Sequence, residues 1–169
     1  FSQKKAFQNI SKKSNIFIEN SFKVAFKIIK KEKIYKFING PISKKNFLNK
    51  NYLGITEFIS KKFKVKKSAM LIFNKDLSVC PITTHLPLKS VTKKINKEVI
   101  LEKIELINNF YRINFKKLPR IAVLGVNPHC ESVNRFNEDE KIIKPTIDKL
   151  KKKNYKVNGP LPADTIFLK

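Results

Sequence analysis

The sequence predicts a single layered α/β domain over residues 1–169, with a mostly parallel sheet and at least one antiparallel strand pair. Three observations support this prediction. Helical and strand periodicities alternate along the chain, no internal repeat or low-complexity linker interrupts them, and 41% of the 169 residues are hydrophobic. A chain of this length buries one core, and strand, helix and strand in succession are typical of a sheet covered by helices.

The first third of the chain contains one clear helical signal and two shorter elements. A helix is predicted first, because apolar residues follow the spacing of a single helical stripe. These residues are Phe22, Ala25, Phe26 and Ile29. Asn20 or Ser21 is expected to cap this helix. Residues 35–38 are a short strand candidate, and Thr56 is placed to cap a short helix in the segment 56–59.

The remainder of the chain alternates strands and helices. Residues 69–73 and 77–82 are predicted strands joined by a turn, so they form the expected antiparallel hairpin. Residues 121–126 are a buried strand that follows a long helix, and a last helix covers roughly residues 138–152. The inward positions are Ile100, Ile104, Ile107 and Tyr111 in the long helix and Ile143, Ile147 and Leu150 in the last one. Pro145 is expected near the first turn of the last helix or at a kink in it.

The formal net charge of +24 suggests a nucleic-acid partner, but a bias in amino-acid usage is the favoured explanation. Proteins that bind phosphates usually mix arginine with lysine, because the guanidinium group makes bidentate contacts. Arg112, Arg120 and Arg135 are the only arginines, while Lys, Ile, Asn and Phe are abundant and Gly is scarce. This bias is typical of an AT-rich coding sequence. We therefore expect no nucleic-acid partner and keep a basic nucleic-acid-binding module as the alternative.

Hydropathy and cysteine content indicate where the protein resides. No apolar stretch reaches the roughly 18 to 20 residues that a membrane span needs, and no signal-peptide pattern is present. Cys80 and Cys130, the two cysteines, lack the spacing of a disulfide framework or a zinc knuckle. We therefore expect no membrane partner and a reducing, cytoplasmic location.

Both histidines of the chain follow an apolar run that is typical of a buried strand. The segment 121–126 leads into Asn127-Pro128-His129, and the segment 77–84 leads into His85. In an open α/β sheet, the residues just past parallel strands border the crevice that holds the functional site. Neutral imidazole is a common ligand for divalent transition metals. His85 and His129 are therefore candidate metal ligands, provided that their strands are parallel neighbours.

Alternatives remain for each candidate side chain. Either histidine could instead satisfy a turn, and the residues reveal no third metal ligand beyond the candidates Cys130, Glu131 and Asp164. Asp164 could be a catalytic carboxylate that faces the cleft near a metal or cofactor, or it could be an N-cap or turn residue. The residues by themselves leave these alternatives open.

Several motifs around these residues occur together in one enzyme family. They are Thr83-Thr84-His85-Leu86-Pro87-Leu88, Gly125-Val126-Asn127-Pro128-His129 and Gly159-Pro160-Leu161-Pro162-Ala163-Asp164-Thr165. Asn39-Gly40-Pro41-Ile42 and Gly54-Ile55-Thr56-Glu57-Phe58 precede them in the same order. The chain thereby resembles the 4-hydroxythreonine-4-phosphate dehydrogenases of pyridoxal phosphate biosynthesis over nearly its whole length. It looks like the middle of a longer, two-domain enzyme whose N- and C-terminal parts are missing.

The resemblance implies a metal- and NAD-dependent (or NADP-dependent) oxidation of 4-phosphohydroxy-L-threonine, with decarboxylation to 3-amino-2-oxopropyl phosphate. It also implies a three-layer α/β/α fold of the isocitrate dehydrogenase type and a homodimer with shared active sites. By motif match, His85 and His129 take the places of two metal-ligating histidines, with Zn, Mg and Co not distinguished. The third ligand is expected beyond Lys169, so this fragment alone is expected to be inactive. Thr56 takes the place of a substrate contact.

Departures from the family pattern affect the expected substrate site. Ile55 stands where the family has a histidine, so a substrate contact is lost or replaced. Another hydroxy acid or a dihydrodiol therefore stays an alternative substrate. After His129 the family has a glycine-rich loop, whereas this chain has Cys130-Glu131-Ser132, which reduces the backbone freedom of the loop. The phosphate and NAD sites are expected outside the chain.

Overall fold

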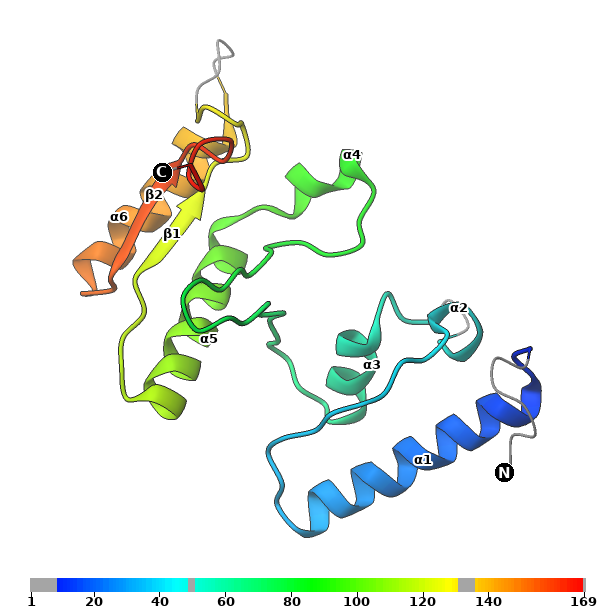
Figure 1. Cartoon of the computed structure of the whole chain (residues 1–169). Coiled ribbons are helices and arrows are strands. Elements are labelled where there is room, and N and C mark those ends of the chain that lie inside the picture. Colours follow the sequence, from blue (N-terminus) through cyan, green and yellow to red (C-terminus); the bar gives the residue numbers. More distant parts are fainter. Residues whose placement is uncertain (1–8, 49–50, 131–135, 169) are drawn as a thin grey trace. The chain divides into compact units, whose positions relative to one another are not determined.

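The computed structural model describes residues 9–48, 51–130 and 136–168. The chain divides after Val65 into two compact units (Figure 1). Among the helices of the described ranges, none combines the length and the hydropathy that a bilayer-spanning segment requires. Whether the two units belong to the single domain expected from the sequence stays a prediction.

The first unit is built on α1 (Lys12–Lys31), a helix of 20 residues. The Ser11 hydroxyl accepts a hydrogen bond from the Ser14 N–H at 3.2 Å, and the Ser14 hydroxyl accepts one from the Ser11 N–H at 3.0 Å. This reciprocal capping box satisfies backbone donors that the helix leaves unpaired. The prediction of Asn20 or Ser21 as the N-cap is wrong, because the box starts the helix upstream of both.

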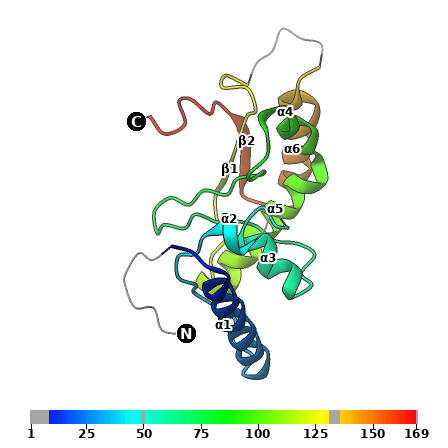
Figure 2. The same cartoon turned by 90° about the vertical axis from the view of Figure 1, so that its right-hand side faces the viewer.

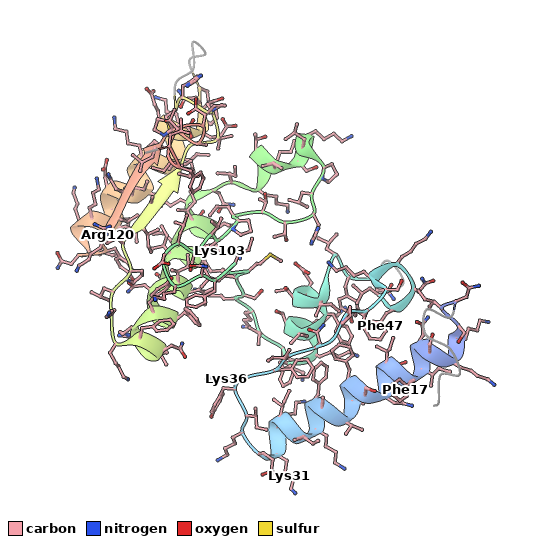
Figure 3. All side chains as sticks on the ribbon, viewed as in Figure 1. Phe17, Lys31, Lys36, Phe47, Lys103 and Arg120 are labelled. Carbon is pink, nitrogen blue, oxygen red and sulfur yellow. The ribbon has the colours of Figure 1, made fainter. Side chains whose placement is uncertain are left out.

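An aromatic cluster forms the core of the first unit. The ring centroid of Phe22 on α1 lies 5.3 Å from that of Phe58 on α3 (Ile55–Lys62). It lies 5.4 Å from that of Phe47 on α2 (Lys44–Phe47), which is labelled in Figure 3. The buried members of the cluster are Phe22, Phe26, Leu48 and Phe58. The helical stripe predicted on α1 is thus confirmed, and ring contacts at these distances add to the apolar burial.

Two predicted features of the first unit are wrong. Residues 35–38 form no strand, and Tyr35 and Ile38 are almost fully exposed. An extended segment needs a partner for its backbone groups, and the strands of the described residues pair only with each other, in the second unit. Thr56 is not the cap of α3, because Gly54 is the N-cap and Thr56 lies within the first turn.

The second unit contains a parallel pair of strands, β1 (Ile121–Leu124) and β2 (Val157–Leu161), with a register shift within the pair. Figure 2 shows the two strands side by side with α6 (Lys144–Lys152) next to them. Gly159 of β2 has a φ of 140°, and an added Cβ there would lie 2.3 Å from the Val123 carbonyl oxygen. The close approach of the strands therefore requires glycine at this position.

Helices on either side of β1 in the sequence supply the rest of this core. α5 (Lys97–Phe115) is capped by Asn96, and a π-helical turn, η2 (Asp139–Ile143), runs directly into α6. The buried residues are Ile100, Ile104, Val123, Ile143, Ile147, Leu150 and Val157. The long helix, the strand after it and the last helix, with Pro145 in its first turn, are therefore confirmed.

The antiparallel pair expected for the sheet is not confirmed. A single antiparallel bridge joins Ile72 and Val79, whose N–H groups each donate to the carbonyl oxygen of the other, at 2.8 and 3.0 Å. Residues 69–73 and 77–82 do not extend this bridge into strands. The turn between them forms as predicted, but it does not extend the parallel sheet of the described residues.

Candidate functional site

The loops that leave β1 and β2 meet at one edge of the parallel pair. The Gly125 N–H donates a hydrogen bond to the Leu161 carbonyl oxygen at 2.9 Å, which continues the pairing past the end of β1. The Ala163 N–H then donates one to the Pro128 carbonyl oxygen, also at 2.9 Å. Because the carboxyl edge of a parallel sheet is where α/β proteins place ligands, these joined loops form the candidate site.

His129 and Asp164 contact each other at this edge. The Nδ1 atom of His129 lies 3.1 Å from Oδ2 of Asp164, and the two side chains are 76% and 36% exposed. A carboxylate beside Nδ1 favours the tautomer that carries its proton there, which leaves the lone pair of Nε2 available to a metal or a proton. The structure thus brings two predicted site residues together, and their chemical roles stay predictions.

A buried carboxylate that sequence reasoning missed shapes the β1 loop. Asp139 of η2 is fully buried, and its Oδ1 accepts a hydrogen bond from the Val126 N–H at 2.7 Å. Its Oδ2 accepts from the N–H and the Nδ2–H of Asn127, at 3.1 and 3.2 Å. The only sequence signal for Asp139 is an acidic residue in the first turn of a helical stripe. That signal is common at helix N-termini and points to no particular loop.

His85 lies in a different setting from the one expected. It is exposed, with a φ of 55°, in the loop between Ile82 and Leu88. Residues 77–82 are not a strand beside β1, because the described parallel neighbour of β1 is β2. The two histidines therefore do not follow neighbouring parallel strands, and the residue beside His129 is Asp164. A metal-binding role for His85 stays a prediction.

An apolar pocket of about 350 Å³ lies between the His85 loop and the end of β1. Ile82 and Leu88 line it from the His85 side, and Val126 lines it from the β1 loop. The rest of its wall includes α4 (Leu88–Val91) and η1 (Thr92–Lys94). The residues that flank the His85 loop and those that lead into the His129 turn thus line one concave surface.

The other predicted site residues remain apart or outside the described ranges. Residues 9–48, 51–130 and 136–168 contain no group of three or more His, Cys, Asp or Glu side chains that could hold a metal ion. Glu131, a candidate third ligand, lies outside these ranges. Ile55 and Thr56 are half-buried in the first turn of α3, in the first unit.

Cys80 is not activated as a nucleophile, because burial raises the pKa of its thiol, and the nearby charge of Lys103 lowers that pKa by less.

Comparison with known proteins identifies the family. The model of the family described as pyridoxal phosphate biosynthetic protein PdxA matches residues 2–169. The chain belongs to this family. The resemblance inferred from the histidine-containing motifs is thereby confirmed, and the mixed helix and strand structure with parallel strands agrees with it.

Relatives in the PdxA family are named dehydrogenases. The chain is 36% identical over 160 residues to the 4-hydroxythreonine-4-phosphate dehydrogenase of a Sulfurihydrogenibium species, covering 92% of this chain and 48% of that protein. It is 40% identical over 118 residues to the one from Aquifex aeolicus, covering 69% and 37%. The crystal structure of the Klebsiella pneumoniae 4-hydroxythreonine-4-phosphate dehydrogenase is similar with a TM-score of 0.74 and 28% identity, covering 88% and 47%. The chain spans about half the length of these relatives, or less.

Proposed function

We propose that the full-length protein oxidises 4-phosphohydroxy-L-threonine with NAD or NADP and decarboxylates the product to 3-amino-2-oxopropyl phosphate. The strongest support is the His129–Asp164 pair at the carboxyl edge of parallel strands, in a chain of the PdxA family. The proposal includes a three-layer α/β/α fold of the isocitrate dehydrogenase type, a homodimer with shared active sites and a cytoplasmic location. Formation of NADH from NAD and this substrate by the full-length protein tests it.

The proposed reaction consists of two steps, and polar groups at the carboxyl edge of the β1–β2 pair can assist both. In the first step, hydride passes from the carbinol carbon to the nicotinamide ring while the hydroxyl proton leaves to a base. In the second step, the bond to the carboxylate breaks, carbon dioxide departs, and a proton takes its place on carbon. Both steps place negative charge on the same substrate oxygen, so a positive group held beside that oxygen favours both.

The surroundings of His129 fit a metal-ligand role. Asp164 occupies the Nδ1 side of the ring of this largely exposed side chain, so Nε2 is left for a cation, as in carboxylate–histidine–metal arrangements. His85 is the proposed second ligand, and the third is proposed to lie outside this chain. When bound, a divalent cation such as Zn, Mg or Co supplies Lewis-acid polarisation of the substrate oxygen. Asp164 is proposed to orient the imidazole throughout.

Asp164→Asn in the full-length protein is expected to lower metal affinity and turnover by roughly 10- to 100-fold. This is the usual cost of losing the residue that hydrogen-bonds the nitrogen of a ligating histidine that faces away from the metal. An amide can still contact Nδ1, but it lacks the charge that favours the Nδ1–H tautomer. Metal content and NADH formation are the measurements. Asp76→Asn, an exposed carboxylate outside the site, is the matched control. Equal behaviour of the two variants would contradict the role of Asp164.

Ile55→His in the full-length protein is expected to raise kcat/KM for 4-phosphohydroxy-L-threonine by roughly 10-fold, the effect of one added hydrogen bond of about 1.4 kcal/mol. The physical reason is that an apolar side chain cannot donate the bond that the family's histidine provides. Ile55→Leu is the control, because it keeps an apolar side chain beside the aromatic cluster. No gain, or the same gain in both variants, would mean that another residue compensates or that the substrate differs.

A further inference from the structure

We propose that Asp139 is a positioning residue for His129, acting through the turn that joins β1 to the candidate site. It would hold the backbone of residues 126–127 so that the imidazole of His129 reaches Asp164 with Nδ1 and presents Nε2 outward. This inference rests on the proposed role of His129 as a ligand. Asp139 lies ten positions after His129 in the chain and belongs to another element, so no motif links them.

The first step of this inference is the hydrogen bonding of Asp139. Its two carboxylate oxygens accept three hydrogen bonds, from Val126 N–H, Asn127 N–H and Asn127 Nδ2–H, at 2.7, 3.1 and 3.2 Å. All three donors belong to the turn, and a carboxylate bonds such donors more strongly than a neutral acceptor does. Because the carboxylate is fully buried, water does not compete for these bonds. The turn is therefore fixed at two successive residues.

The second step is the short path from this turn to the imidazole. The Cys130 N–H donates to the Asn127 carbonyl oxygen at 3.0 Å and closes a tight turn around Pro128 and His129. His129 itself is largely exposed, so packing contributes little to its orientation. The direction of its ring is thus set by the backbone of the turn at one end and by Asp164 at the other.

The third step is the anchoring of Asp139 in the core. Asp139 begins the π-helical turn η2, and Ile143 at the end of η2 is buried in the core of the second unit. The buried Asn137, just before this turn, also holds it, since its Oδ1 accepts a hydrogen bond from the Glu140 N–H at 2.8 Å. π-helical turns occur frequently at functional sites, where they offset one residue from the regular helix. Here Asp139, the first residue of the π-helical turn, is the one that reaches the β1 loop.

Substitution of Gly125 is an independent way to perturb the contact between Asp139 and the turn at residues 126–127. A Cβ added at Gly125 would lie 2.6 Å from Cys130 Sγ, 2.9 Å from the Asn127 carbonyl oxygen and 3.2 Å from Asp139 Oδ1. Even alanine must therefore displace atoms of the turn, including the Asn127 carbonyl oxygen, beside the carboxylate. Gly125→Ala should reproduce the effect of removing the charge from Asp139 without changing Asp139 itself.

The decisive experiment measures the tautomer of His129 by ¹⁵N NMR of the imidazole in the full-length, metal-free protein, at a pH of roughly 8, where imidazole is ordinarily neutral. His129→Gln assigns the signal. Wild type is expected to show mainly the Nδ1–H form. Asp139→Asn is expected to shift the population toward the Nε2–H form, because the loosened turn no longer holds the ring against Asp164. Asp148→Asn, an exposed carboxylate on α6, is the matched control and should match wild type.

The outcomes separate this inference from the proposed function. A tautomer shift in Asp139→Asn, absent in Asp148→Asn, supports the inference even if the wild-type protein proves to bind no metal. An unchanged tautomer in folded Asp139→Asn overturns it, even if the wild-type enzyme is fully active. Should Asp139→Asn fail to fold, Gly125→Ala decides by the same measurement. A double-mutant cycle with Asp164→Asn adds a further criterion, since residues acting through one ring give non-additive effects and independent residues give additive ones.

Discussion

His129→Ala in the full-length protein is expected to abolish both metal retention and NADH formation while leaving the fold intact. The loss should exceed the roughly 10- to 100-fold cost of removing a residue that only orients a ligand, because the proposed ligand itself is removed. The fold should persist, since the exposed side chain of His129 contributes little to the core. Metal content by mass spectrometry, NADH formation and far-UV circular dichroism measure the three quantities.

His85→Ala and an exposed-lysine variant complete this experiment. His85→Ala is expected to behave like His129→Ala if both histidines hold the same cation. Lys152→Ala, at the exposed end of α6, should match wild type in metal content and rate. If both histidine variants kept full metal occupancy and normal rates, the histidines would be turn residues only.

Ile147→Ala is expected to lower the free energy of unfolding of the second unit by about 3 kcal/mol, within the range of 2 to 5 kcal/mol typical of buried Ile or Leu truncations. Ile147 of α6 is fully buried in a core that also contains residues of η2 and of both strands. Its Cδ1 atom lies so close to Gly159 that an added Cβ there would be 3.0 Å away. The surroundings are therefore well packed, and the cavity left by truncation should collapse only in part.

The midpoint and slope of urea unfolding measure this loss. Ile113→Ala is the matched control, because Ile113 is exposed on α5 and its truncation should cost no more than about 0.5 kcal/mol. Similar losses in the two variants would show that the core described for the second unit is not the one that stabilises it.

Sequence periodicity predicted the elements whose side chains bury a continuous stripe. Ile100, Ile104, Ile147 and Leu150 were assigned to the core from spacing alone, and all four are buried. The same reasoning found the stripe of Phe22 and Phe26 on α1. A helix makes its backbone hydrogen bonds within one segment, so its pattern is visible without knowledge of the rest of the chain.

Strands and helix ends were harder to predict because they depend on partners. Residues 35–38 and 77–82 are apolar enough for strands. In the described structure, however, 35–38 has no strand partner, and 77–82 has only the isolated bridge between Val79 and Ile72. The start of α1 was misplaced because Ser11 and Ser14 cap it reciprocally ahead of the apolar stripe. Apolar content alone therefore did not decide where backbone groups find partners.

The candidate site was predictable only in part. Motifs identified His129 and Asp164, and the parallel pairing of β1 and β2 brings them together. Asp139 could not be found in this way, since its role depends on hydrogen bonds between η2 and the β1 loop that form only in the folded chain. Gly125 was noted within a motif, but its tight approach to Cys130 and Asn127 is visible only in three dimensions.

NADH formation by the full-length wild-type protein is the most direct test of the proposal that this PdxA-family protein is an active dehydrogenase. The protein would be incubated with 4-phosphohydroxy-L-threonine, NAD and a divalent cation, and then again after removal of the cation with a chelator. We predict NADH together with an equal amount of carbon dioxide in the first case, and neither in the second. Absence of NADH with every cation tested, or formation of NADH that is unaffected by the chelator, would contradict the proposed metal- and NAD-dependent oxidation.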